Sequence, residues 1–402
     1  MPQKLLVLRN CGLINPQNVD SYVARRGFEA LRRVQSGMTP AQVIEEVKRS
    51  GLRGRGGGGF PTGLKWEQAA QSPGERKYII CNASEGEVGA FKDRYLLEND
   101  PFAVIEGIAI AAYAVGARKA YIYLRSEYAH VANLLVNATA QVKQKGLLDG
   151  GGWSLEVELR LGSGGYVCGE ETALMESLEG RRGEPRARPP FPPSQGLLGL
   201  PTVINNVETL MNIPWIVVNG ADRFCGTGTR ESKGTKVFSV SGDVRRPGVY
   251  ELEMGSSLSE LVGEIALAGD VKMVQVGGAS GRIVPGSRMD VALSYESVLG
   301  AGPVIVFDGS RDIVDIMRRT MEFFAEESCG KCAPCREGTQ AMLETLARIA
   351  DGRGLRKDLK ALEQLSSAMM LTSSCGLGQA APVPVMDSLR YFSQEYDAHI
   401  SQ

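Results

Sequence analysis

The chain has 402 residues, of which 43% are hydrophobic and 23% charged, and its formal net charge is −1. This is the balance of an ordinary globular protein that is long enough for two or three domains. Acidic and basic residues are well mixed, so no nucleic-acid partner is indicated. The most apolar stretch, residues 102–116, contains Glu106 and is too short to span a bilayer, so we predict no membrane insertion.

The first half of the chain predicts a helical segment followed by an α/β domain. Residues 1–50 form the N-terminal helical segment, with helices over 19–35 after Asn18 and over 41–50 after Thr39-Pro40. Residues 51–225 then alternate between apolar runs and helical periodicity, which is typical of a parallel sheet with crossover helices. A helix from Asn206 closes this domain. The strands are expected at 77–83, 120–124 and 155–161, and the helices at 102–117, 128–142 and 169–180.

The second half predicts two smaller domains. Residues 236–310 read as two strands, a helix over 257–269 and two more strands, which indicates a β-grasp (ubiquitin-like, SLBB-type) domain. From residue 311 to 402 every segment has helical periodicity, which predicts a four-helix bundle. Its helices are expected at 311–326, 336–351, 356–372 and 384–397.

Four cysteines in the last domain form a candidate ligand set. Cys329, Cys332 and Cys335 have Cys-x-x-Cys-x-x-Cys spacing, and Cys375 follows forty residues later, between the third and fourth predicted helices. A cubane iron–sulfur cluster needs four such thiolates. A structural zinc site is the main alternative, but zinc usually takes two cysteine pairs and no histidine is near. A thioredoxin-like pair is disfavoured by the third cysteine.

The other four cysteines, Cys11, Cys81, Cys168 and Cys225, are scattered singly. They form neither a second ligand set nor a disulfide framework. Free thiols together with an oxygen-sensitive metal site are typical of a reducing compartment, so we expect a cytoplasmic protein.

The glycine-rich stretch from Gly54 to Gly59 is a second candidate site. It contains a formal G-x-G-x-x-G, but a helix rather than a strand precedes it, so a Rossmann fingerprint is disfavoured. A flexible surface loop is the plain alternative. Because Arg53, Lys65 and aromatic residues flank bare backbone N–H groups, the stretch also suits a phosphate with an attached ring system, such as FMN or another nucleotide.

Acidic and amide residues are expected around one edge of the sheet, where ligands bind in open α/β sheets: some follow the first predicted strand and others lie at the starts of predicted helices. Helix charge compensation and helix capping are the alternatives for single members of this set. The set comprises Asn82, Ser84, Glu85, Glu87, Glu170, Glu171, Asn205 and Asn206.

Six motifs occur in the order of a known family: GLRGRGGGGFPTGLKW (51–66), CNASEGEVGAFKDR (81–94), GYVCGEETAL (165–174), RARPPFPPSQGLLGLPTVINNVET (186–209), ESCGKCAPCREG (327–338) and SSCGLG (373–378). The chain resembles the NADH-oxidising flavin subunit of respiratory complex I, the 51 kDa type. The same family includes subunits of NAD-linked hydrogenases, formate dehydrogenases and electron-bifurcating complexes. The resemblance implies FMN, NAD(H) and one [4Fe-4S] cluster as cofactors.

The resemblance also implies roles for individual residues. The FMN site would be formed by Gly54, Arg55, Gly56, Gly57, Lys65, Asn82, Ser84, Glu85, Tyr166, Gly169, Glu170, Glu171, Asn205, Asn206 and Thr209. NADH would be held by Phe60, Glu87, Glu171, Arg188 and Phe191, with Glu87 near the nicotinamide. No side-chain base is expected, because the cofactor carries the chemistry. The cluster ligands would be Cys329, Cys332, Cys335 and Cys375.

Four positions depart from the usual pattern of the family. Ser84 replaces an Asp, Val88 a Pro, Arg188 a Lys, and Gln68 an aromatic residue that often holds the adenine. These changes keep open a scaffold that has a cluster but no NADH turnover, and a bifurcating subunit is the other alternative. The carboxylate of Glu171 favours NAD over NADP. Expected partners are a thioredoxin-like [2Fe-2S] subunit and a further catalytic subunit of hydrogenase, formate dehydrogenase, acyl-CoA reductase or complex I type.

Overall fold

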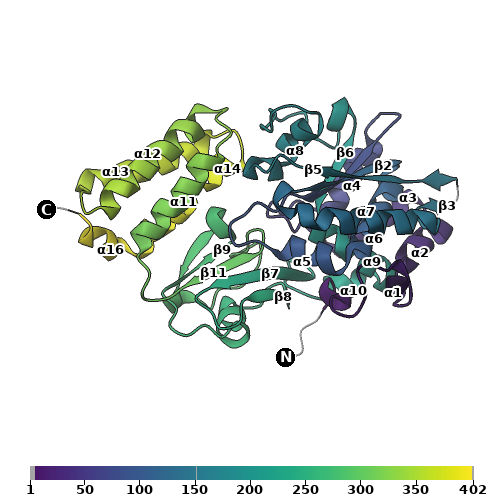
Figure 1. Cartoon of the computed structure of the whole chain (residues 1–402), viewed down its shortest axis with the longest axis horizontal. Coiled ribbons are helices and arrows are strands. Elements are labelled where there is room, and N and C mark those ends of the chain that lie inside the picture. Colours follow the sequence, from purple (N-terminus) through teal and green to yellow (C-terminus); the bar gives the residue numbers. More distant parts are fainter. Residues whose placement is uncertain (1–4, 151, 401–402) are drawn as a thin grey trace.

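The computed structural model of the chain describes residues 5–150 and 152–400. Figure 1 shows an α/β part at one end, a group of helices formed by the C-terminal residues at the other, and a mainly stranded region between them. None of the helices in the described residues is both long and apolar enough to cross a membrane.

The α/β part is built on a four-stranded parallel sheet with the order β5-β2-β1-β6. Three of its strands, β1 (Tyr78–Ala83), β2 (Lys119–Leu124) and β5 (Glu156–Leu161), lie where the sequence predicts them. The fourth, β6 (Thr202–Asn206), was not predicted. It is short and follows a proline-rich loop, so it has no periodic signal of its own; pairing with β1 defines it.

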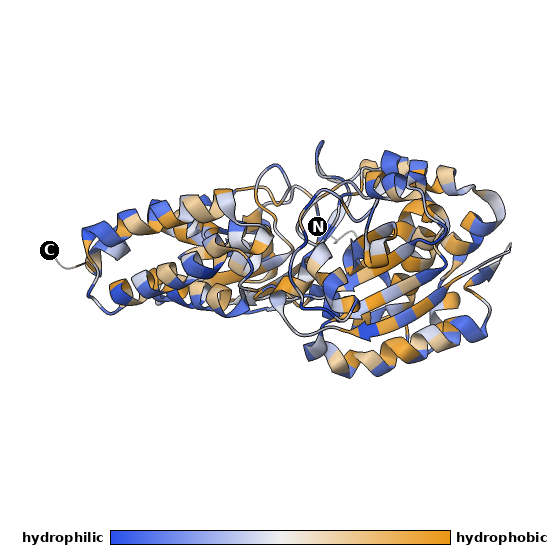
Figure 2. Cartoon of the chain, turned by 90° about the horizontal axis from the view of Figure 1, so that it is seen from above, coloured by the Kyte–Doolittle hydropathy of each residue, from blue (hydrophilic) through white to orange (hydrophobic). Residues whose placement is uncertain are grey.

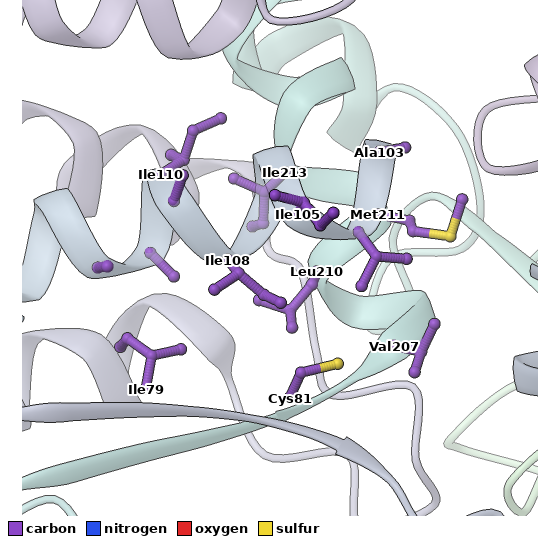
Figure 3. Close-up of a cluster of buried hydrophobic side chains, with 14 of the residues drawn as sticks. Ile79, Cys81, Ala103, Ile105, Ile108, Ile110, Val207, Leu210, Met211 and Ile213 are labelled. Carbon is purple, nitrogen blue, oxygen red and sulfur yellow. The ribbon is translucent and has the colours of Figure 1, made fainter. Parts of the chain in front are cut away.

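Two apolar helices cover this sheet, namely α6 (Pro101–Val115) and α9 (Val207–Asn219). A Cβ atom at Gly107 would lie 2.2 Å from the carbonyl oxygen of Leu210, so glycine is required where the two helices touch. Their side chains form a close-packed core over β1 (Figure 3). The labelled residues are Ile79, Cys81, Ala103, Ile105, Ile108, Ile110, Val207, Leu210, Met211 and Ile213.

The N-terminal helices pack on the same core. The single helix expected over 19–35 is instead two, α1 (Val19–Val23) and α2 (Glu29–Gly37). The chain turns between them at Gly27 and Phe28. Glycine is required at 27, because a Cβ atom there would collide with the ring of Tyr22, and Phe28 has a positive φ of 60°, which a helix does not allow. The buried carboxylate of Glu106 accepts hydrogen bonds from the N–H groups of Phe28 and Leu31, which secures this turn.

The remaining elements of this part surround the sheet. They are α3 (Pro40–Ser50), α4 (Thr62–Gln71), α5 (Lys92–Asn99), α7 (Ala129–Gln144), the small hairpin β3 (Asp149–Gly150) and β4 (Trp153–Ser154), α8 (Glu171–Leu178) and α10 (Ala221–Cys225).

The stranded region is a mixed five-stranded sheet with the order β10-β9-β11-β7-β8, in which β11 is parallel to β7 and the other pairs are antiparallel. Its strands are β7 (Thr235–Gly242), β8 (Gly248–Glu253), β9 (Met273–Val276), β10 (Arg282–Pro285) and β11 (Pro303–Phe307). Strand β10 was not predicted. The helix expected over 257–269 is only a short π-type turn, Glu260–Ile265, since Leu267 has a positive φ of 55°.

The C-terminal part is helical, as predicted, and its helices alternate between hydrophobic and hydrophilic residues (Figure 2). The first three are α11 (Ile313–Glu327), α12 (Ala333–Ala350) and α13 (Arg356–Thr372). The fourth expected helix, 384–397, is divided at Phe392 into α15 (Val383–Tyr391) and α16 (Ser393–Ala398), and the short helix α14 (Gly376–Ala380) precedes it.

Candidate functional site

A cavity of about 450 Å³ opens between the glycine-rich loop, helix α4 and the carboxyl end of strand β6. This is the edge of a parallel sheet at which ligands bind. Its lining contains most of the residues that the motifs single out: Gly54, Gly56, Gly58, Gly59, Phe60, Lys65, Gln68, Asn82, Gly169, Glu171, Arg188, Phe191, Pro193, Ile204, Asn205, Asn206 and Thr209.

A second cavity, of about 540 Å³, continues from the first. Gly56, Asn82, Gly169 and Asn206 line both, so the two cavities form one cleft. The second adds Gly57, Ser84, Glu85, Glu87, Tyr166 and Glu170 from the predicted site. It also contains residues that were not predicted, because they come from the two later parts of the chain. These are Ser280, Gly300 and Ala301 of the stranded region, and Gly376, Leu377 and Ala380 of α14.

The glycine-rich loop is held open toward the cleft. The N–H of Gly54 donates to the carbonyl of Phe60 at 2.9 Å, which closes the loop on itself. A Cβ atom at Gly56 would lie 3.0 Å from Cβ of Asn206, in space that belongs to the cleft, and Gly57 has a φ of +110°. Backbone N–H groups without side chains suit a phosphate that approaches the chain closely, so this loop fits the phosphate of a nucleotide or FMN.

Three amide side chains are fixed by hydrogen bonds at the sheet edge. Asn82 donates to the carbonyl of Gly169 at 2.9 Å, and Asn205 accepts from the indole N–H of the buried Trp66 at 2.8 Å. Asn206 accepts from the N–H of Glu208 at 3.0 Å, so it also caps helix α9. The capping interpretation is therefore correct for Asn206, and the residue lines the cleft as well.

Two neighbouring carboxylates face the cleft from the start of helix α8. Glu171 lies 3.0 Å from Nζ of Lys65 and 3.4 Å from the guanidinium of Arg188. Glu170 accepts from the N–H groups of Thr172 and Ala173 through Oε2, and this caps the helix. Its other oxygen, Oε1, is buried, lies 3.7 Å from the guanidinium of Arg188 and has no hydrogen-bond partner among the described residues, so it can accept from a ligand N–H or O–H group.

Two further carboxylates, Glu85 and Glu87, follow strand β1. Glu85 accepts from the N–H groups of Asp93 and Arg94 and so caps helix α5; burial and then the charge of Asp93 raise its pKa to about 7. Burial likewise raises the pKa of Glu87, against the hydrogen bonds that it accepts from Ser280 and Tyr166.

Arg55, which was predicted to contact the flavin, does not line either cavity, and its side chain lies away from the cleft. Its side chain is fully buried and lies toward the carbonyl of Lys233 and the hydroxyl of Tyr295. Its N–H donates to Oγ1 of Thr209 at 2.8 Å. In sequence, a cation within a run of glycines is typical of a residue that binds phosphate. In the structure, the guanidinium of Arg55 instead donates to acceptors on Lys233 and Tyr295.

Two aromatic rings lie exposed at the cleft. Phe60 is 44% and Phe191 54% exposed, although large apolar side chains are usually buried, and both line the first cavity. Gln68, in place of the usual aromatic residue, lines it too. Exposed rings in a cavity suit stacking against a planar ring such as adenine.

The four cysteines of the candidate cluster site come from two parts of the chain, the segment that joins α11 to the first turn of α12 and the residue before α14. The N–H of Ser374, beside Cys375, donates to the sulfur of Cys332; burial alone would raise the pKa of that thiol, but this and the N–H of Cys335 hold it below its usual value. Burial, and then the charges of Cys332, Cys375 and Cys329, raise the pKa of Cys335 to about 11. All four sulfurs therefore lie within electrostatic range of one another.

Four free thiols from two parts of the chain match the donor set of a cubane cluster, which takes four thiolates. Among residues 5–150 and 152–400, no three Cys, His, Asp or Glu side chains lie close enough together to hold one metal ion. Cys335 lies in the first turn of α12 rather than in the preceding loop, which the sequence did not predict.

Comparisons with known proteins identify the family of the chain. Residues 47–215 match the Nuo51 FMN-binding domain, 237–266 the SLBB domain, and 315–399 the iron–sulfur binding region of NADH-ubiquinone oxidoreductase-F. The F 2 subunit of NADH-quinone oxidoreductase from Rhizobium meliloti is 44% identical over 99% of this chain and 98% of its own. The HndC subunit of NADP-reducing hydrogenase from Solidesulfovibrio fructosivorans is 45% identical, over 99% and 84%.

A solved structure, that of an NAD⁺-reducing [NiFe]-hydrogenase in the H₂-reduced state, superposes with a TM-score of 0.90. It is 40% identical, over 99% of this chain and 67% of that chain. Sequence identity of this level over nearly the whole chain shows a shared family as well as a shared fold. The chain therefore belongs to the family of the FMN-binding and iron–sulfur subunit of NADH-quinone oxidoreductase, which also includes subunits of NAD(P)-linked hydrogenases.

Proposed function

We propose that this chain is the NADH-oxidising, or NAD-reducing, flavoprotein subunit of a multi-subunit oxidoreductase, with FMN, NAD(H) and one [4Fe-4S] cluster as cofactors. One observation carries the proposal. The cleft that begins at the glycine-rich loop ends at Gly376 and Leu377, directly after the cluster ligand Cys375. A flavin in this cleft lies next to the cluster, as electron transfer between them requires.

The residues of the cleft divide into two groups by chemistry. The glycine-rich loop, Lys65, the amides and the hydroxyl of Thr209 suit the phosphate and ribityl chain of FMN, with Glu170 Oε1 as an acceptor for the ring. Phe60 and Phe191 suit the adenine of the dinucleotide, and Glu171 its ribose. Glu87 then lies at the nicotinamide end. When bound, FMN accepts hydride and the cluster carries single electrons, so the protein supplies placement and charge.

The finer organisation of the chain is part of the proposal. We assign residues 1–50 to an N-terminal helical segment, 51–225 to the FMN and NADH domain, 236–310 to a β-grasp domain and 311–402 to the cluster domain. The strand order β8-β7-β11-β9-β10, with the first and last strands of the region parallel, supports the β-grasp assignment. A four-helix bundle is supported by the packing of α11, α12, α13 and α15 around one core.

The partners follow from the cluster. The thiol ligands Cys329 and Cys332 are only half-buried, so the cluster lies near the surface and its electrons leave to another subunit. The relatives named above belong to a quinone oxidoreductase and to hydrogenases. We propose a thioredoxin-like [2Fe-2S] subunit and a further catalytic subunit as partners, and a cytoplasmic location.

Reconstitution tests the function directly. The chain is loaded with FMN and an iron–sulfur cluster, and NADH is added without oxygen. We expect NADH to bleach the flavin absorbance and to reduce ferricyanide catalytically, because the cleft places nucleotide and flavin together. A protein that holds both cofactors but shows neither bleaching nor turnover would instead be a scaffold without NADH turnover, the alternative suggested by Gln68 and Ser84.

Glu171 gives a prediction about nucleotide preference. Replacing it by glutamine is expected to raise the kcat/KM ratio of NADPH to NADH about tenfold, because a carboxylate repels the 2′-phosphate and an amide does not. Arg188, 3.4 Å away, then keeps only its longer ion pair with Glu170, at 3.7 Å, and can pair with that phosphate. Steady-state kinetics with both nucleotides measure the ratio, and Glu322→Gln on the exposed side of α11 is the matched control. An unchanged ratio in Glu171→Gln would rule out the ribose contact.

A further inference from the structure

A loop of the stranded region reaches into the cleft and holds Glu87. The hydroxyl of Ser280 donates to Oε2 of Glu87 at 2.6 Å, and the N–H of Ser280 donates to Oε1 at 3.1 Å. Ser280 ends a short 3₁₀ turn, Gly278–Ser280, directly after strand β9. One residue 193 positions further along the chain therefore satisfies both oxygens of this carboxylate.

Glycine makes this approach possible. Gly278 has a φ of +75°, and a Cβ atom there would lie 2.4 Å from Cγ of Glu87 and 2.6 Å from the carbonyl oxygen of Val88. Such a distance is far below van der Waals contact, so any other residue would push the loop away from Glu87. The backbone conformation, the missing side chain and the hydroxyl of Ser280 all serve the same contact.

The surroundings determine what the contact does. Burial acts to protonate Glu87, and the hydrogen bonds from Ser280 and from the hydroxyl of Tyr166, at 2.8 Å, act to keep it ionised. The guanidinium of Arg125 packs directly against Gly86, since a Cβ atom there would lie 2.3 Å from its Nη1. The other charged residues that line the cavity with Glu87 are Glu85, Lys92, Asp93, Glu170 and Arg188.

We propose that Ser280 is a positioning residue that keeps the Glu87 carboxylate ionised and oriented toward the nicotinamide, and thereby favours NAD⁺ over NADH at this site. The inference rests on the proposed function, which places the nicotinamide beside Glu87. The ring of NAD⁺ carries a positive charge and that of NADH does not, so an ionised carboxylate at this position stabilises the oxidised nucleotide selectively.

Binding measurements test this without turnover. Calorimetry on the FMN- and cluster-loaded protein measures the Kd of NAD⁺ with oxidised flavin, and the Kd of NADH after anaerobic chemical reduction of the flavin. In Ser280→Ala the Kd of NAD⁺ is expected to rise about tenfold, while the Kd of NADH changes by less than about threefold. Ser280→Thr keeps a hydroxyl and is expected to restore most of the NAD⁺ affinity.

Two further variants separate positioning from general damage. Gly278→Ala leaves the hydroxyl of Ser280 in place but displaces it, so the same selective loss of NAD⁺ affinity is expected. Ser239→Ala is the matched control, because Ser239 donates to the carbonyl of Gly89 in the same loop at 2.9 Å and does not touch Glu87. FMN content is measured first and FMN is added back where it is low.

The outcomes distinguish this inference from the proposed function. If the unchanged protein binds neither nucleotide, the proposed function fails and this inference with it. If the unchanged protein binds both, but Ser280→Ala and Gly278→Ala keep its ratio of the two Kd values, this inference alone is overturned.

Discussion

Replacing Cys375 by alanine is expected to remove the iron–sulfur cluster and to leave reduction of the flavin by NADH intact. Of the four proposed ligands, Cys375 alone comes from the α13–α14 loop; its side chain is buried, and its charge acts on the thiol of Cys335. Without it a cubane lacks one of its four thiolates. The cleft loses no side chain that faces the nucleotide, so the two halves of the reaction should separate.

The measurement is the iron content together with flavin bleaching. Bound iron is expected to fall from about four atoms per chain to near zero. The rate of anaerobic bleaching by NADH should remain within about twofold of the unchanged protein, since positioning at the flavin is preserved. Cys225→Ala is the control, because this half-buried thiol donates to the carbonyl of Asp222 and lies outside the candidate ligand set. Full iron content in Cys375→Ala would remove this residue from the ligand set.

The second large effect concerns a buried ionic network that joins the flavin domain to the stranded region. Glu208 lies 2.6 Å from Nζ of Lys236 and 3.0 Å from Nζ of Lys92, and all three side chains are almost wholly buried. Burial acts to raise the pKa of Glu208, but Lys236, Lys92 and Arg55 outweigh it and hold that pKa below its usual value. Burial lowers the pKa of Lys236 to about 7.

Glu208→Gln is therefore expected to destabilise the protein by about 3–5 kcal/mol, because it leaves the buried ammonium group of Lys236 without its carboxylate. Lys92 keeps its second partner, Asp93, at 2.6 Å. Lys236→Met is expected to cost clearly less, since Lys92 still neutralises Glu208. A loss of this size lowers the midpoint of thermal unfolding by roughly 10 °C in a protein of this size class. Differential scanning calorimetry on the flavin-loaded protein measures both.

The exposed pair of Lys119 and Glu156, at 2.9 Å, provides the matched control. Glu156→Gln removes a comparable ion pair at the surface, where such pairs contribute about 0–1 kcal/mol, so its midpoint should not move measurably. Equal effects of Glu208→Gln and Lys236→Met would show that the network is a simple pair rather than one acid shared by two bases.

Several elements show how far local pattern determines this fold. Strands β1, β2 and β5 and helices α6 and α7 lie where apolar runs and helical periodicity predict them. Helix α3 begins at Pro40 after a Thr39–Gln42 capping box, which is a purely local signal. Helix α5 was missed, because its cap is not adjacent: Glu85, several residues earlier, accepts from its first N–H groups. The hydrophobic periodicity of a helix carries no information on a capping side chain that comes from a preceding loop.

The site divides in the same way. The cysteine spacing, the glycine-rich loop and the polar residues after β1 and β6 are short-range patterns, and all but Arg55 line the cleft or the cluster site. Ser280, Lys236, Gly300 and Ala301 carry no such signal. They are ordinary residues of the stranded region in sequence, and only the packing of that region against the flavin domain brings them to Glu87, Glu208 and the glycine-rich loop.

The sequence by itself therefore determined the class of the domains, because apolar runs and helical periodicity are local signals. It also indicated the candidate cluster ligands and cofactors, through the spacing of three cysteines and a family resemblance carried by six short motifs. The tertiary structure decided the direction of Arg55, the hold of Ser280 on Glu87 and the sharing of Glu208 by two lysines. Each of these contacts involves a buried polar or charged group, which must be paired. Packing decides which residue lies within hydrogen-bond distance of it, and that residue can be far away in the chain.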